Sequence, residues 1–305
     1  MFTSLLLLMS LQDADAAEKK TVLVFTSDQD PTTTAIVDAY KASTTFAIRR
    51  TYDLGSIPNP EEFIHENLDD ADPALIFALG DVALEVASRA WPTVPMVYGN
   101  VSLASARRAG RNDLISVSGH VDPTLAAKDF ATLFPYAHSV SIVRGAGDSD
   151  PWWPLLEGAL QGAGVDVNVV EAGSVDEIDD AVAGALFRSD VLWIAEDPRL
   201  WTAVALRDTF EKARQHDVPV VTWEPRHLAG SAPASVAFRP DTQSIADSAA
   251  HVTEQIVRQG IKPDTLATYP SPVLVAGREA LLDARVPLSK RTKAVVDEWL
   301  EEDSK

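Results

Sequence analysis

The sequence predicts an α/β protein built as two doubly wound, parallel-sheet lobes joined by three crossing strands. Short β-branched runs alternate regularly with amphipathic stretches from residue 21 onward, which is the pattern of a parallel α/β sheet. Most of these runs are apolar on both faces, as strands buried between two helical layers are. The length of 305 residues exceeds one ordinary domain and fits two hydrophobic cores.

The individual elements follow from this alternation. The predicted strands are Thr21–Thr26, Phe46–Tyr52, Ala74–Leu79, Pro95–Tyr98, Leu114–Val117, Ser139–Arg144, Asp166–Glu171, Val191–Ala195 and Val218–Trp223. The predicted helices are Pro31–Ser43, Pro60–Asp70, Val82–Ala90, Pro123–Phe134, Pro151–Ala163, Val175–Phe187, Leu200–His216 and Thr242–Gln259. Several helices begin with a capping side chain, often followed by proline, at Asp30-Pro31, Asp122-Pro123, Asp150-Pro151 and Ser174.

The two lobes should be joined by crossing strands rather than by a flexible linker, since the sequence has no repeat and no low-complexity segment. The expected crossings are Ser116–Val121, Ala237–Asp241 and Ser271–Ala276. They place residues 17–117 and 241–270 in an N-terminal lobe, and residues 118–240 and 271–305 in a C-terminal lobe. Three crossings predict a hinge that bends while both lobes stay folded.

The first 16 residues read as a signal peptide. Phe2–Leu11 is an apolar run, and Ala14-Asp15-Ala16 supplies the small residues that precede a cleavage site, so we expect cleavage before Ala17. No later segment approaches the ~20 apolar residues of a membrane span, and no cysteine is present for lipidation. We therefore expect a periplasmic or otherwise extracytoplasmic protein that is soluble after cleavage.

Charge and cysteine content exclude several functions. The formal net charge is -19 at pH 7, whereas a nucleic-acid partner requires clustered lysine and arginine. The absence of cysteine excludes disulfides, thiolate nucleophiles and cysteine-ligated metal sites. Neither property identifies a substrate, because acidity of this kind mainly favours solubility.

Six stretches, in this order, carry a resemblance to a known family. They are Ala74–Val101, Val117–Gly119, Leu133–Gly145, Val191–Asp197, Val218–Ser235 and Val273–Pro287. Together they resemble the substrate-binding component of ABC importers of the tryptophan-importer-like family, a type I periplasmic binding protein of Venus-flytrap form. The chain differs from that family at Asp81, where Thr or Ser is usual, and lacks an Asp-Pro in the loop holding Asn100 to Ser102.

The resemblance implies a function. It implies an extracytoplasmic solute-binding protein that captures a small ligand between two lobes by hinge motion. It also implies that the loaded protein, a monomer with no cofactor, delivers the ligand to an ABC permease in the inner membrane. A ligand-sensing receptor domain of a signalling system is the alternative use of the same fold, and an α/β enzyme is a weaker one.

Candidate ligand contacts come from topology, because ligands of open parallel sheets bind beyond the carboxyl ends of the strands. The residues so selected are Ser27, Asp28, Gly80, Asp81, Asn100, Ser102, Gly145, Asp148, Trp152, Glu196, Asp197, Trp223 and Glu224. Acidic side chains outnumber the nearby Arg144, Arg199 and Arg226, which favours an amino acid or another amine-bearing ligand. Backbone amides of Gly80 and Ser102 would bind its carboxylate, and Asp197 or Glu224 its ammonium.

Structural roles compete with these assignments. An acid at a strand-to-helix junction commonly caps the helix, and for Asp30 and Asp150 this is the favoured interpretation. Trp152, Tyr98 and Trp223 are candidates for stacking on a ligand, although aromatic side chains at such positions more often pack into a core. Trp153, Trp193 and Trp201 are assigned to packing.

An enzymatic function finds little support in the sequence. Gly145-Ala146-Gly147 lies between a strand and a helix as in a dinucleotide-binding fingerprint, but Asp148 and Asp150 would repel the pyrophosphate. The chain has no G-x-S-x-G elbow, no H-E-x-x-H and no Walker loop, and its six histidines lack metal-ligand spacing. Glu196 and Asp197 are adjacent on one strand and should point to opposite faces. We therefore expect no catalysis and no metal.

Overall fold

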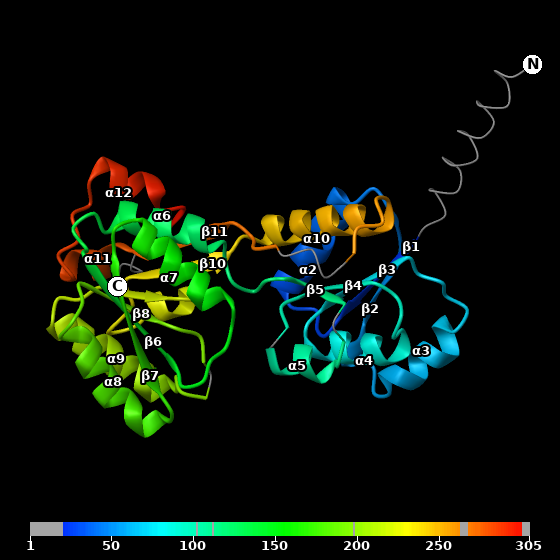
Figure 1. The fold of residues 1–305 in the computed structure, drawn as a ribbon, viewed down its shortest axis with the longest axis horizontal. Helices are drawn as coiled ribbons and strands as arrows, with labels where there is room; N and C mark the ends of the chain where they lie inside the picture. The colour runs from blue at the N-terminus through cyan, green and yellow to red at the C-terminus, as the bar shows by residue number, and fades with distance from the viewer. Residues whose placement is uncertain (1–20, 102, 112, 198, 263–267, 301–305) are drawn as a thin grey trace, which may run out of the picture. The chain divides into compact units, whose positions relative to one another are not determined.

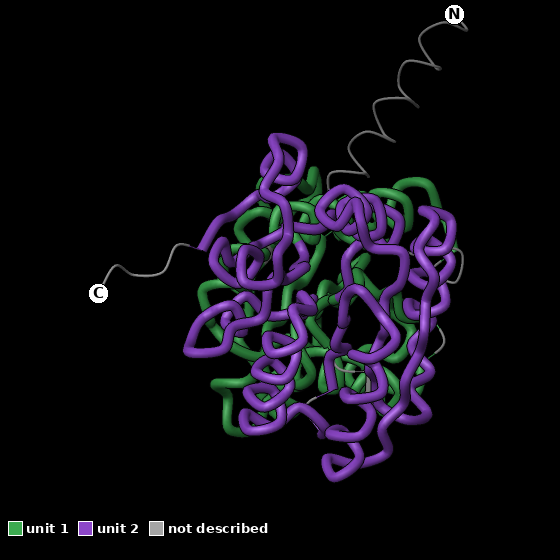
Figure 2. The backbone as a smooth tube through the Cα atoms, turned by 90° about the vertical axis from the view of Figure 1, so that its left-hand side faces the viewer, with its two compact units in different colours: residues 1–119, 241–270 green, residues 120–240, 271–305 purple. Residues whose placement is uncertain are grey.

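The protein is described by a computed structural model over residues 21–101, 103–111, 113–197, 199–262 and 268–300 (Figure 1). The predicted signal peptide, residues 1–16, lies outside the described residues. The chain divides into two compact units (Figure 2). Unit 1 comprises residues up to Gly119 and Asp241–Pro270, and unit 2 comprises His120–Pro240 and the residues from Ser271 onward. The first division falls two residues beyond the one expected from the sequence.

Unit 1 is a three-layer α/β structure around a parallel sheet. Its strands have the order β2-β1-β3-β4-β5. Their bounds are β1 Thr21–Thr26, β2 Ala47–Asp53, β3 Leu75–Leu79, β4 Met96–Gly99 and β5 Leu114–Val117. One face packs on α2 (Pro31–Ser43) and α10 (Thr242–Val257). The other face is covered by η1 (Leu54–Ser56), α3 (Pro60–Leu68), α4 (Asp81–Ala90) and the short α5 (Leu103–Arg108).

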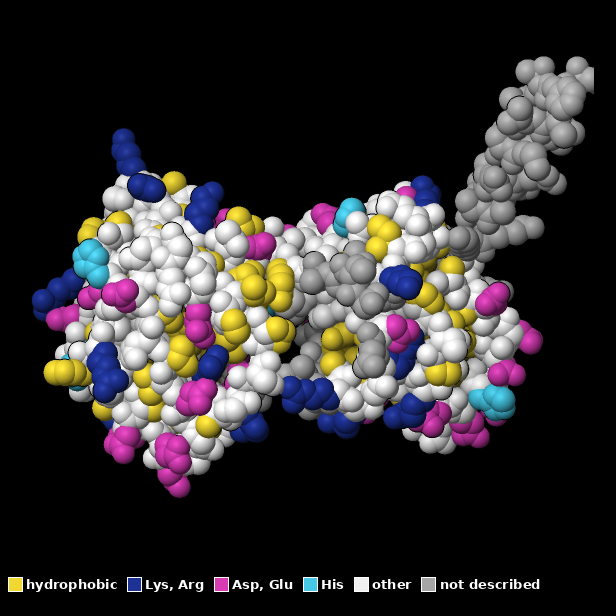
Figure 3. Space-filling view, viewed as in Figure 1, with side chains coloured by type: hydrophobic (Ala, Val, Ile, Leu, Met, Phe, Trp, Pro, Cys, Tyr) yellow, Lys and Arg dark blue, Asp and Glu magenta, His cyan; other side chains and the backbone are white. Residues whose placement is uncertain are grey.

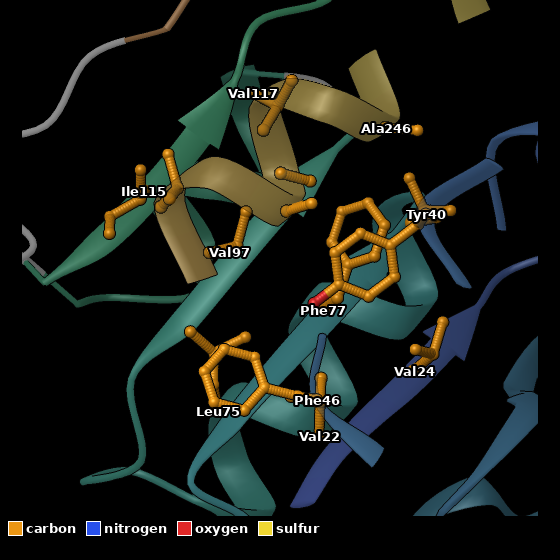
Figure 4. Packing of buried hydrophobic residues seen from close by; sticks show 14 of the residues in the cluster. Val22, Val24, Tyr40, Phe46, Leu75, Phe77, Val97, Ile115, Val117 and Ala246 are labelled. Atoms are coloured by element: carbon orange, nitrogen blue, oxygen red, sulfur yellow. The ribbon is translucent and has the colours of Figure 1, made fainter. Parts of the chain in front are cut away.

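The core between the unit 1 sheet and helices α2 and α10 contains a long-range polar link. Tyr40 is fully buried, and its ring lies 4.5 Å from that of Phe77 (Figure 4). Its hydroxyl hydrogen-bonds Thr253 Oγ1 on α10 at 2.9 Å. Burial raises the pKa of Tyr40 to about 12, so the phenol stays neutral and satisfied inside the core.

Unit 2 contains a seven-stranded sheet with the order β12-β11-β10-β9-β8-β6-β7. Its strands are β6 Ser139–Gly145, β7 Asp166–Ala172, β8 Val191–Ile194, β9 Val220–Thr222, β10 Val236–Pro240, β11 Pro272–Gly277 and β12 Glu298–Leu300. All neighbouring pairs are parallel except β10 and β11. The two units therefore have the mostly parallel α/β architecture that the sequence predicts.

Helices cover both faces of the unit 2 sheet. One face packs against α8 (Ile178–Leu186) and α9 (Ala203–Gln215). The other packs against α6 (Pro123–Leu133) and α7 (Trp152–Gly162), with α12 (Lys290–Val295) beside α6. Trp193 of β8 points to this second face, where it stacks on Phe238 at 5.3 Å and on Phe130 at 5.9 Å. The remaining short elements are η2 (Val175–Glu177), η3 (Pro225–Leu228) and α11 (Arg278–Asp283).

Helix starts test the capping predictions. Asp30 accepts a hydrogen bond from Thr33 N at 2.8 Å, and Asp122 accepts from Thr124 N and Leu125 N, as predicted. The prediction for Ser174 is wrong, since its side chain makes no capping bond. The carboxylate of Glu177 instead turns back to accept from Gly173 N at 2.8 Å, which satisfies the amide ahead of the helix.

Surface and membrane properties follow from the same coordinates. Acidic and basic side chains are interspersed over the face shown in Figure 3. Within the described residues, no helix combines the length and the apolar character needed to cross a membrane.

Candidate functional site

Each sheet has one point where the direction of strand winding reverses. In unit 1, β1 lies between β2 and β3, and in unit 2, β6 lies between β7 and β8. The connections leave on opposite faces at such a switch point, which opens a crevice outside the carboxyl ends of the two strands. The loops after β1 and β3 in unit 1, and after β6 and β8 in unit 2, therefore form the candidate site of each unit.

At the unit 1 switch point, Ser27 and Gly80 are packed against each other. Gly80 has φ +91°, and a Cβ atom there would lie 2.6 Å from Ser27 Oγ, so only glycine fits. Ser27 Oγ accepts a hydrogen bond from Ala83 N at 2.9 Å and so caps the first turn of α4. The Gly80 amide donates to Gly99 O at 3.0 Å. This amide is therefore not free for a ligand carboxylate, and that part of the sequence prediction is wrong.

The other predicted contacts of unit 1 occupy the same edge of its sheet. The carboxylate of Asp28 is exposed and accepts from Asp30 N at 3.2 Å. Hydrogen bonds led by that from Thr33 N lower the pKa of Asp30, as its capping role requires. Asp81 is the first residue of α4, and Asn100 is exposed with φ +51° directly after β4. Ser102 lies outside the described residues.

At the unit 2 switch point, Asp197 folds over Gly145. The Asp197 side chain is buried and accepts from Arg199 N at 2.9 Å, Arg199 Nε at 3.0 Å and Arg199 Nη2 at 2.7 Å. These bonds hold the pKa of Asp197 below its ordinary value, although burial acts against them. A Cβ atom on Gly145 would come within 2.3 Å of Asp197 Oδ2, so the close approach needs glycine. The carboxylate is already neutralised within the loop.

The loop from β6 to α7 is held together by its own carboxylates. Asp148 accepts from Trp153 Nε1 at 2.7 Å and from Asp150 N at 3.0 Å. Asp150 accepts from Trp152 N at 2.9 Å, which confirms that it caps this helix start, and lies 3.1 Å from His120 Nε2. Burial alone would raise the pKa of Asp150, but the bonds from His120 and Trp152 outweigh it and lower the pKa.

The tryptophan side chains near this loop are buried and pack against neighbouring residues. Trp152 is 4% exposed, its ring stacks on His120 at 4.7 Å, and its Nε1 donates to Val121 O at 2.7 Å. Trp153, Trp193 and Trp201 are buried, as predicted. His120 is not among the site residues predicted from the sequence, because a single histidine after a strand gives no sign of which residues it contacts. Ligand stacking by Trp152 stays a prediction, with little ring surface left for it.

Glu196 is a carboxylate at the switch point of unit 2 that makes no ion pair with the described residues. It follows β8, faces solvent, and makes no hydrogen bond or ion pair with the described part of the chain. Desolvation by surrounding protein atoms raises its pKa, and the charge of Glu224 adds to this, while His120 and Arg226 act in the opposite direction. Asp197, the next residue, is buried. Both residues lie beyond β8, which ends at Ile194, so the expectation that they are adjacent on one strand is wrong and the course of the loop separates their side chains.

Glu224 and Trp223 complete this edge of unit 2. Glu224 Oε2 lies 3.8 Å from Arg226 Nε, which is longer than a hydrogen bond. Trp223 is half-buried and meets the ring of His227 edge-on at 4.9 Å. Tyr98, the remaining predicted aromatic contact, belongs to β4 of unit 1 and packs beside its core.

Across residues 21–300, apart from the gaps given above, no three His, Asp or Glu side chains are grouped to hold a metal ion.

The chain forms two α/β units and passes between them three times. Each unit has two loops with polar side chains at the switch point of its sheet. These features define the type I periplasmic-binding-protein fold. An ABC domain from Streptococcus pneumonia in complex with L-Trp is similar, with TM-score 0.54 and 12% identity, covering 92% of this chain and 100% of that one. A substrate binding protein with adhesive properties from Clostridium difficile, in its ligand-free, open structure, has TM-score 0.60 and 16% identity, covering 92% and 99%. A conserved domain protein from Vibrio cholerae has TM-score 0.53 and 16% identity, covering 92% and 99%.

No protein-family model and no curated protein matches the sequence. At these low identities the structural likeness concerns the fold. The fold class predicted from the sequence is confirmed, and the chain shares it with substrate-binding proteins of ABC transporters, as the resemblance implied.

Proposed function

We propose that the chain is an extracytoplasmic solute-binding protein that captures a small amine-bearing ligand between its two lobes and delivers it to an ABC permease. The fold supports a binding role. The ligand class rests on one observation, the unneutralised carboxylate of Glu196 at the switch point of unit 2.

The electrostatics of Glu196 favour a cation. A carboxylate that is partly desolvated and lies near a second carboxylate is less stable in its charged form. An ammonium group bound beside it relieves both effects and forms a charge-assisted hydrogen bond. Asp197 offers no such gain, since Arg199 already binds both of its oxygens. We therefore assign the ammonium to Glu196 and Glu224 rather than to Asp197.

Unit 1 contributes the second set of proposed contacts. Asp28, Asp81 and Asn100 lie at the carboxyl ends of its strands, where ligands of parallel sheets bind. The ligand carboxylate, if one is present, has to use amides other than that of Gly80.

A thermal-shift screen of the mature protein against amino acids, amines and small peptides tests this proposal. A ligand at ~100 times its Kd stabilises the folded state by ~2.7 kcal/mol, which is readily detected. Loss of a charge-assisted bond costs about 1.5–3 kcal/mol, so Glu196→Gln and Glu224→Gln should each weaken amine binding roughly 10- to 100-fold. Glu66→Gln, an exposed acid of unit 1, is the matched control.

The binding results for the three variants decide whether the ligand carries an amine. Amine binding that is lost in the two site variants and kept in Glu66→Gln supports the ligand class. An amine that binds all three variants equally, or a screen that yields only anionic or neutral ligands, refutes it. Mass spectrometry of the recovered ligand should show it chemically unchanged, and a converted product would contradict the binding role.

A further inference from the structure

A groove of about 570 Å³ lies within unit 2, between the first half of α9 and the segment that follows η3. Its volume is in the range of ~300–1,000 Å³ that small-molecule sites occupy. Eleven residues line it, Trp201, Ala203, Leu206, Arg207, Phe210, Arg226, His227, Ala229, Gly230, Ser231 and Ala232. Neither Glu196 nor Glu224 is among them.

The inner wall of the groove is aromatic and apolar. Phe210 and Trp201 are 6% and 5% exposed and belong to the core beneath α9, with Leu206 packed beside them. The His227 ring lies 6.0 Å from that of Phe210. A planar or aliphatic ligand body would bury apolar surface against this wall.

The polar groups of the wall are hydrogen-bond donors. Burial lowers the pKa of His227, with the charge of Arg226 acting in the same direction, so its ring is neutral at pH 7. Thr222 is fully buried and its hydroxyl lies 2.8 Å from His227 Nδ1. Among the described residues this is the one side-chain partner of Thr222, so we infer that the hydroxyl donates to Nδ1 and leaves the ring proton on Nε2.

Trp201 supplies a second donor with no acceptor. Its Nε1 atom is buried and has no hydrogen-bond partner within the described chain. Buried N–H groups are normally paired, so this one is an unsatisfied donor beneath the surface of the groove wall.

The charge of the groove is positive. Arg207 and Arg226 line it, whereas no Asp or Glu does. Arg207 is paired with Asp208, whereas Arg226 is 77% exposed at its side chain and lies 3.8 Å from Glu224, beyond hydrogen-bond distance. A guanidinium whose N–H groups are not hydrogen-bonded to a carboxylate binds an anionic oxygen by charge-assisted hydrogen bonds.

We propose that this groove is a second ligand site, which binds a small organic carboxylate with an aromatic or aliphatic body. The body packs against Phe210 and Trp201, and the carboxylate pairs with Arg226. The site is distinct from the amine site at Glu196, because different residues of opposite charge line the two, although Arg226 lies near Glu224.

Phenylacetate and its neutral isostere phenylacetamide are the probes for this site. Titration calorimetry should show saturable binding of phenylacetate to the full mature chain. Arg226→Gln should weaken phenylacetate about tenfold and leave phenylacetamide unchanged, since only the charged group is lost. Arg214→Gln, on α9 and paired with Glu211 outside the groove, is the matched control and should change neither.

Two further measurements locate the ligand. Ala203→Trp, at an exposed position of the rim, should block both probes. The indole N–H resonance of Trp201, assigned with Trp201→Phe, should shift on binding because the ligand body packs against the indole ring. Glu196→Gln should leave phenylacetate binding unchanged, which separates this site from the amine site.

Three results would overturn the proposal. They are no saturable phenylacetate binding, equal binding by Arg226→Gln and Arg214→Gln, or loss of binding in Glu196→Gln. The last result would place the carboxylate in the amine site and leave the groove without a ligand.

Discussion

Gly145→Ala is the most direct test of the close packing at the switch point of unit 2. The added methyl carbon would lie 2.3 Å from Asp197 Oδ2, where ordinary contacts begin at 3.4 Å. The carboxylate therefore has to withdraw by about 1 Å, which exceeds what its hydrogen bonds tolerate. Gly145 has no positive φ, so the effect comes from the contact and not from backbone strain.

The magnitude follows from the bonds that Asp197 would lose. Its bond from the Arg199 amide is a hydrogen bond to a charged group, worth about 1.5–3 kcal/mol. Its pairing with the Arg199 guanidinium adds less than ~1 kcal/mol, because that side chain is 78% exposed. We expect Gly145→Ala to lower the free energy of unfolding by roughly 2–3 kcal/mol.

Urea unfolding of a double-mutant cycle isolates this contact. Asp197→Ala removes the atoms that the new methyl group meets, so Gly145→Ala/Asp197→Ala should be about as stable as Asp197→Ala alone, with a coupling of ~2 kcal/mol. Gly158→Ala, at an open helical position of α7, should instead stabilise by ~0.5–1 kcal/mol. Additive effects, or a neutral Gly145→Ala, would refute the packing argument.

Three further predictions concern single side chains. Tyr40→Phe should lower the free energy of unfolding by ~1 kcal/mol in urea, because the bond to Thr253 is lost while Thr253 still donates to the helix backbone. Trp152→Phe should cost ~1–3 kcal/mol in the same assay, because it leaves the buried carbonyl of Val121 without its donor; an unchanged midpoint would contradict this. Glu196→Gln should have a higher free energy of unfolding than the unsubstituted protein at pH 7, and the same free energy of unfolding at a pH below the ordinary glutamate pKa. The reason is that a carboxyl group with a raised pKa in the folded state loses stabilising free energy as pH rises through that pKa. An equal difference in free energy of unfolding at both pH values would contradict this.

The fold could be predicted from the sequence because its central strands, such as β1, β3 and β8, are buried on both faces. Thr21–Thr26 and Leu114–Val117 form strands with the predicted bounds, and Pro31–Ser43 is the predicted helix. The chain passes between the units at Pro240–Asp241 and Pro270–Ser271, at the edges of the predicted crossings Ala237–Asp241 and Ser271–Ala276. The same segments also form β10 and β11, an antiparallel pair in the unit 2 sheet that the sequence does not predict. That pairing joins distant segments, and no local pattern encodes it.

The candidate site could be predicted only as a set of loops. The strand-end rule finds the loops holding Gly80 and Asp197, but not whether their polar groups are free. The Gly80 amide donates a hydrogen bond to the Gly99 carbonyl, and the Asp197 carboxylate pairs with the Arg199 guanidinium. Glu196 is exposed in the loop after β8, whereas its neighbour Asp197 is buried and paired with Arg199. Such differences depend on contacts that form after folding, so they appear in the structure and not in the composition of a loop.

The position of α10 in the chain has a consequence for biosynthesis. This helix completes unit 1, and its Thr253 binds Tyr40, 213 residues earlier. A ribosome adding about 5–20 residues per second needs roughly 10–40 s to cover that interval. During this time one apolar face of the first sheet is covered by α2 alone, so the amino-terminal half cannot complete its core ahead of the remainder. The nascent polypeptide should therefore depend on chaperone protection until its last quarter has been translated.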